Sequence, residues 1–126
     1  IGTYQEVIAE LMRTQALESG CMMNLVTGDV DRGPAISYCR FAIRDEANEP
    51  AWEALSGSDM DVASLEEVMA MPLYSDIRGR GVARERPFLV ETLRAVASGT
   101  LAVPPPDPID LTEAVEEAVA RSPRAV

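Results

Sequence analysis

The chain has 126 residues and a formal net charge of −10 at pH 7, and 47% of its residues are hydrophobic. A chain of this length fits one domain and can build a core without metals or disulfides. The acidic charge argues against nucleic acid and against a membrane surface as partners, because both are bound largely through Lys and Arg.

The first predicted element is a helix that begins after Thr3. Thr3 and Glu6 have the spacing of a capping box, in which side chains satisfy the backbone amides at the start of a helix. The apolar residues between Tyr4 and Met12 then recur at helical spacing. Gly20 is the expected end of this helix, although the apolar residues at 21–26 could extend it.

The next segment can be read in two ways. Residues 28–34 are predicted to form a loop, because Gly, Asp and Pro gather there. We expect residues 35–44 to form a helix, since their polar side chains fall on one helical face. The alternative is a strand that pairs with residues 21–27, which would place a β-hairpin at 21–43.

Two short helices are predicted in the middle of the chain. Pro50 can open the first of them, which includes Trp52 and Leu55, because proline suits the first helical position. The second runs to Met71, and either Asp61 or the pair Ser64 and Glu67 caps it.

Residues 73–87 are predicted to be an irregular connection, because glycines interrupt a run of arginines there. A helix from Pro87 to Ser98 follows, and Gly99 closes it. The side chains of this helix that we expect to point inward are Leu89, Leu93, Val96 and Ala97.

The end of the chain has a different character. Residues 1–100 are interpreted as a helical domain, 101–109 as a proline-rich spacer, and 110–126 as a docking helix and tail. The docking helix is short, and an isolated helix below about 12–15 residues is marginal in water. Its apolar stripe therefore needs a covering surface, either on its own domain or on another protein. The predicted partner-binding residues of this stripe are Leu111, Val115, Ala118 and Val119.

Four arginines form the one basic cluster of the sequence. They are Arg78, Arg80, Arg84 and Arg86. Because the arginine fork binds carboxylates and phosphates through two hydrogen bonds, the cluster is a candidate contact for an anion or an acidic partner. The alternative interpretation is that these arginines pair with the chain's own abundant acids.

The sequence offers no catalytic residues that we can name. It has no His and no Lys, so a nucleophilic Cys39 would lack its usual activating base. Cys21 and Cys39 are interpreted as small buried hydrophobic residues. No metal ligands and no cofactor site are assigned. The absence of a visible signal peptide or membrane span favours a cytoplasmic protein.

The expected fold is therefore mainly α, a compact bundle of about five short helices with a proline-tethered C-terminal amphipathic helix. The α+β version with the hairpin is the alternative. The expected function is that of a non-catalytic interaction protein, such as an accessory subunit, adaptor or assembly factor, which holds another protein or its own copies. Two alternatives stay open. One is an acidic inhibitor of the immunity or antitoxin type that masks a basic partner, and the other is a small carboxylate-based enzyme or metal binder.

Overall fold

The computed structural model describes residues 3–25, 33–103 and 105–121. Within these residues it contains five helices and a three-stranded sheet. The expected number of about five helices is therefore found, but the sheet makes the fold α+β, and the α+β alternative is closer to the structure than the mainly α bundle. The predicted loop at 28–34 lies mostly outside the described residues, as does the end of the predicted tail.

The chain divides into two compact units. The first contains Ile1–Ser19 and Phe41–Gly81, and the second contains Gly20–Arg40 and Val82–Val126. The C-terminal segment belongs to the same unit as the strands. We describe each unit by itself.

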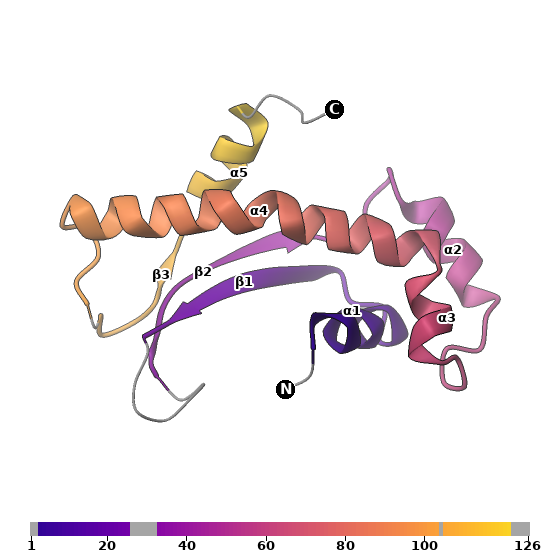
Figure 1. Ribbon diagram of the computed structural model, residues 1–126. Coiled ribbons are helices and arrows are strands. Elements are labelled where there is room, and N and C mark those ends of the chain that lie inside the picture. The colour runs from indigo at the N-terminus through magenta and orange to yellow at the C-terminus, as the bar shows by residue number, and fades with distance from the viewer. Residues whose placement is uncertain (1–2, 26–32, 104, 122–126) are drawn as a thin grey trace. The chain divides into compact units, whose positions relative to one another are not determined.

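The first unit contains the short helices that local signals predicted. Helix α1 runs over Tyr4–Arg13, and its cap is Thr3, whose hydroxyl accepts a hydrogen bond from the amide of Glu6 at 3.3 Å. The side chains of Ile8 and Met12 are buried. Figure 1 shows α1 near the N-terminus of the chain.

Helices α2, Glu49–Ser56, and α3, Leu65–Met69, also form as predicted. Proline lies in the first turn of α2, and Trp52 is buried with its indole N–H donating to the carbonyl of Ile43 at 3.0 Å. The capping box predicted for α3 is complete, since the side chains of Ser64 and Glu67 each accept from the other residue's backbone amide.

Strands replace the helix that we expected over 35–44. Strand β1 is Glu18–Asn24 and strand β2 is Ala35–Ala42. Along β1, half-buried and exposed residues alternate, which is the period of a strand with one covered face. Of the two interpretations of this segment, the hairpin is therefore closer to the structure.

Hydrogen bonds at the two ends of this pair set its direction. The amide of Ile43 donates to the carbonyl of Leu17, and the amide of Leu25 donates to the carbonyl of Pro34. The start of β1 thus meets the end of β2, so the two strands run antiparallel. Figure 1 shows their arrows pointing in opposite directions.

A third strand comes from the C-terminal segment. Strand β3, Ile109–Asp110, pairs in parallel with β2, in the register Ser37 to Ile109 and Tyr38 to Asp110. The sheet order is β1-β2-β3, so β2 is central. The predicted proline-rich spacer therefore leads into the sheet, and α5, Thr112–Arg121, begins directly after it.

Helix α4 is a single element of 26 residues, Pro72–Ala97. The predicted irregular connection is wrong, because the helix continues through Gly79, Gly81 and Pro87. A Cβ atom at Gly79 would meet no atom within 4 Å, so no close contact requires a glycine there. The helix ends as predicted before Gly99, which has the positive φ of 79° that favours glycine.

Candidate functional site

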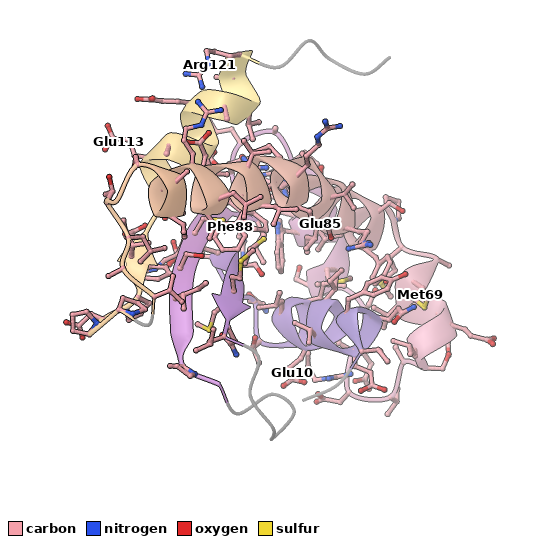
Figure 2. All side chains as sticks on the ribbon, turned by 60° about the vertical axis from the view of Figure 1, so that its left-hand side comes forward. Glu10, Met69, Glu85, Phe88, Glu113 and Arg121 are labelled. Atoms are coloured by element: carbon pink, nitrogen blue, oxygen red, sulfur yellow. The ribbon has the colours of Figure 1, made fainter. Side chains whose placement is uncertain are left out.

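Helix α5 carries the apolar stripe that the sequence singled out, and part of it lies in the core of the second unit. Leu111 and Val115 are buried in one cluster with Cys39 and Phe88, and the exposed fraction of Val115 is 0%. Val119 is half-buried against this cluster, and Ala118 is also half-buried. Figure 2 shows Phe88 on α4. The inner part of the stripe is thus covered by the chain's own residues.

An ion pair joins α5 to α4. The guanidinium of Arg84 donates to both carboxylate oxygens of Glu116, at 2.9 and 2.8 Å, and the Arg84 side chain is largely buried. A fork that meets both oxygens of one carboxylate also sets the orientation of the pair. Arg84 therefore holds an acid of its own chain, as the alternative interpretation of the arginine cluster expected.

Arg80 does the same in the first unit. Its guanidinium donates to both oxygens of Asp45, at 2.7 and 3.0 Å, to Asp76 at 2.9 Å, and to the carbonyl of Ala42 at 3.1 Å. The Arg80 guanidinium lowers the pKa of the Asp45 carboxyl below its usual value, chiefly by donating hydrogen bonds to the ionised form. This network fastens α4 to the turn that follows β2.

The other two arginines of the predicted site lie elsewhere. The Arg78 guanidinium carbon is 4.0 Å from the centre of the Tyr4 ring, a cation–π contact within the first unit. Arg86 is exposed on the part of α4 that belongs to the second unit. Arg78, Arg80 and Arg84 therefore make separate contacts along one helix, and Arg86 is exposed on the same helix.

The face of α4 predicted to be inward is exposed. Leu89 and Leu93 have exposed fractions of 46% and 58%. The buried side chains of this part of the helix are instead Phe88, Thr92 and Ala95. Thr92 shares a hydrogen bond of 2.9 Å with the hydroxyl of Ser37, which satisfies both buried side chains. The exposed large apolar residues here are Val82, Leu89, Val90, Leu93 and Val96. Four of them share one face of the helix, and we call these four, Val82, Leu89, Leu93 and Val96, the α4 stripe.

Sequence reasoning missed the α4 stripe because it assigned one apolar face to this helix. The segment carries apolar residues on two faces, the α4 stripe and the face of Phe88 and Ala95. An apolar arc this wide exceeds what one packed face of a surface helix needs. The width of this apolar arc was the signal from which a second, exposed apolar face could have been predicted.

The two cysteines lie side by side on neighbouring strands. Cys39 of β2 is 1% exposed, and the half-buried Cys21 of β1 packs against its cluster. The Cys21 thiol donates a hydrogen bond to the Cys39 sulfur, which lowers the pKa of Cys39 to about 7, with a smaller contribution from Arg84 in the same direction. The same hydrogen bond raises the pKa of Cys21, and burial adds to that effect.

The concave regions of the first unit include the following two. One is an apolar pocket of about 160 Å³ beside Leu55 and Leu73. The other, of about 330 Å³, is an open hollow beside Glu6, Glu10 and Arg13. The apolar pocket is below the roughly 300–1,000 Å³ of common small-molecule sites. Within the part of the chain that the structure describes, no group of three His, Cys, Asp or Glu side chains could hold a metal ion.

Comparison with known proteins adds no family. No protein-family model matches the chain, and it has no significant match among curated proteins or solved structures. Across residues 3–25, 33–103 and 105–121, none of the helices combines the length and the apolar character that crossing a membrane requires.

Proposed function

We propose that the chain is a non-catalytic interaction protein, an accessory subunit, adaptor or assembly factor, that binds another protein through the α4 stripe. The observation that supports this proposal is the exposure of Leu89 and Leu93 in the C-terminal part of α4, a part of the helix whose other face is packed. An exposed apolar row on a monomer is typical of a protein contact. The C-terminal stripe, in contrast, is largely used within the second unit.

The spacing of the α4 stripe suits a helix as the contacting element. Leu89, Leu93 and Val96 are separated by four and then three positions, and Val82 lies one heptad before Leu89. This alternation is the pattern by which one helix packs along another. The partner therefore contributes an amphipathic helix that lies along α4.

The charged residues beside the stripe indicate which charges the partner helix would carry. Arg86 and Arg94 are exposed, and at 3.6 residues per turn both lie on the same side of the stripe, Arg86 at its edge and Arg94 about 80° farther round the helix. Arg94 also lies 3.8 Å from the carboxylate of Glu91. Acidic residues along the matching edge of the partner helix would complement them. A second copy is the weaker candidate, because each copy carries a net charge of −10 and the two would repel each other.

Site-specific crosslinking tests the proposal in cells that produce the protein. A photoreactive residue replaces Leu93 in one variant and Glu113, exposed on α5, in the control. A protein captured only from position 93 is then purified, and its affinity is measured for the unmodified chain and for Leu93→Glu. We expect at least a tenfold loss of affinity in Leu93→Glu and little loss in Glu113→Gln, since a charge would be buried in the contact.

Three outcomes would overturn the proposal. The first is capture of the chain's own copies alone, and the second is equal capture from both positions. The third is an affinity that Leu93→Glu leaves unchanged but that falls steeply as the salt concentration rises. This result would indicate that an acidic surface of the chain binds a basic partner, as in the inhibitor hypothesis.

A further inference from the structure

We propose that Cys21 and Cys39 form a reversible disulfide site that joins β1 to β2 when the protein meets a low-molecular-weight disulfide. Both cysteines are reduced in the structure. The proposal goes beyond the interaction role and is independent of it.

The geometry of the strands supports the bond. β1 and β2 are neighbours in the sheet. Both cysteines pack against the cluster that contains Phe88 of α4 and Val115 of α5. Directly paired residues of antiparallel strands have Cα atoms about 4.5–5.5 Å apart, which lies within the range that disulfides span. The thiols are already in hydrogen-bond contact.

Gly20 brings the two backbones together beside the pair. A Cβ atom at this position would lie 2.5 Å from the carbonyl oxygen of Cys39, closer than real contacts allow. The absence of a side chain at Gly20 therefore permits the close approach of β1 to β2 next to the thiols. Little backbone movement is needed to form the bond.

The two thiols have different tasks in the exchange. Cys21 is half-buried and is the thiol that an external disulfide can reach, whereas Cys39 is 1% exposed. In the mixed disulfide that Cys21 forms, Cys39 is the neighbouring thiol, because it pairs across the two strands. Cys21 is thus the entry point, and Cys39 resolves the intermediate.

The reaction balances as two exchanges. Cys21 first gives up its proton, and its thiolate attacks one sulfur of oxidised glutathione, which forms a mixed disulfide and releases one glutathione thiolate that takes up a proton. The Cys39 thiolate then attacks the Cys21 sulfur of the mixed disulfide, which forms the Cys21–Cys39 bond and releases the second glutathione. Two electrons pass from the cysteine pair to glutathione, and the two protons lost by the cysteines are bound by the released thiols.

Redox titration of the intact chain tests the site. The protein is equilibrated in mixtures of reduced and oxidised glutathione, quenched with an alkylating reagent, and weighed by mass spectrometry. We expect an unalkylated species lighter than the reduced chain by about two mass units, the two hydrogens lost on disulfide formation. Reductant should restore both alkylation sites.

The same titration in concentrated urea provides the matched control, because it removes the strand pairing and keeps the sequence. We expect the equilibrium constant for bond formation to be at least tenfold larger in the folded chain. Linkage then requires the oxidised protein to melt at a higher temperature than the reduced one.

Either of two results would overturn the proposal. In one, the folded chain stops at glutathione adducts or intermolecular dimers under conditions that close the bond in urea. In the other, both thiols remain reduced across the titration. Neither result bears on the α4 stripe, so the two proposals fail separately.

Discussion

The guanidinium of Arg84 meets both carboxylate oxygens of Glu116, and this pair links α4 to α5 within the second unit. Arg84 is the more buried partner. The pair lies next to the packed cluster of Leu111 and Val115, so the C-terminal helix is held both by apolar burial and by a directed ionic contact.

Replacing Arg84 tests how much the directed contact contributes. Arg84→Gln should lower the free energy of unfolding by about 1–2 kcal/mol, because it removes two charge-assisted hydrogen bonds and leaves Glu116 without its fork. Urea denaturation measures the change. Arg121→Gln is the control, since the Arg121 contact to Glu117 is exposed and 4.0 Å long, and it should cost less than about 0.5 kcal/mol. Equal losses in both variants would refute the assignment.

Substitutions on two faces of α4 test which face is inward. Phe88→Ala should cost about 3–5 kcal/mol, because it empties a space in the core of the second unit. Leu93→Ala, on the α4 stripe, should change the free energy of unfolding by less than about 1 kcal/mol in the isolated chain. Thermal and urea unfolding of the two purified variants provide the comparison. A larger loss of stability in Leu93→Ala than in Phe88→Ala would mean that the predicted inward face was correct.

Truncation before the spacer tests the dependence of the sheet on the C-terminal segment. A chain that ends at Gly99 loses β3, Leu111 and Val115. We expect the second unit to lose its fixed side-chain packing, because β2 would lose a neighbouring strand and its core would lose two buried side chains. Near-UV circular dichroism and amide hydrogen exchange report this loss. A truncated chain with unchanged exchange in β2 would show that α5 is dispensable for folding.

Asp45 supplies a pH-dependent contribution to the first unit. Hydrogen bonds from Arg80 lower the pKa of this carboxyl in the folded chain relative to the unfolded chain. Its stabilisation is therefore complete above about pH 4, the usual pKa of aspartate, and is lost as the pH falls through the lower folded value. Arg80→Gln should weaken the decline in stability between neutral and acidic pH, measured as urea midpoints.

Arg13→Gln is the matched control for this experiment. It removes an exposed contact between Arg13 and Glu10 on α1. The decline in stability with acid should match that of the unmodified chain. If both variants show the same pH dependence, the Arg80 network does not provide the contribution.

Local signals predicted the starts of the short helices of the first unit correctly, whereas α1 ends at Arg13 and not at the expected Gly20, which lies in β1. The Ser64 and Glu67 box, the proline in the first turn of α2 and the cap at Thr3 each act within one helical turn. The energies that decide these ends come from neighbours in sequence. Such elements can be predicted without knowledge of the rest of the chain.

The strands could not be predicted in the same way. Residues 35–42 have an apolar pattern that also fits a helix, and their parallel partner lies about 70 positions later, at Ile109 and Asp110. Pairing with β1 and β3 decides that this segment is a strand and not a helix, since a strand obtains its hydrogen bonds from distant segments. The contact between Cys21 and Cys39 follows from that pairing, so the sequence alone interpreted them only as two small buried residues.

The sequence by itself determined an acidic chain, the starts of its short helices, and the apolar character of the segments that form α4 and α5. Only the tertiary structure decided that α4 continues through Gly79, Gly81 and Pro87, and that Phe88 rather than Leu93 faces the core. The physical reason is that glycine costs a helix interior about 1 kcal/mol and proline about 3 kcal/mol relative to alanine. Burial of large side chains and the anchoring of Arg80 and Arg84 can together outweigh such differences.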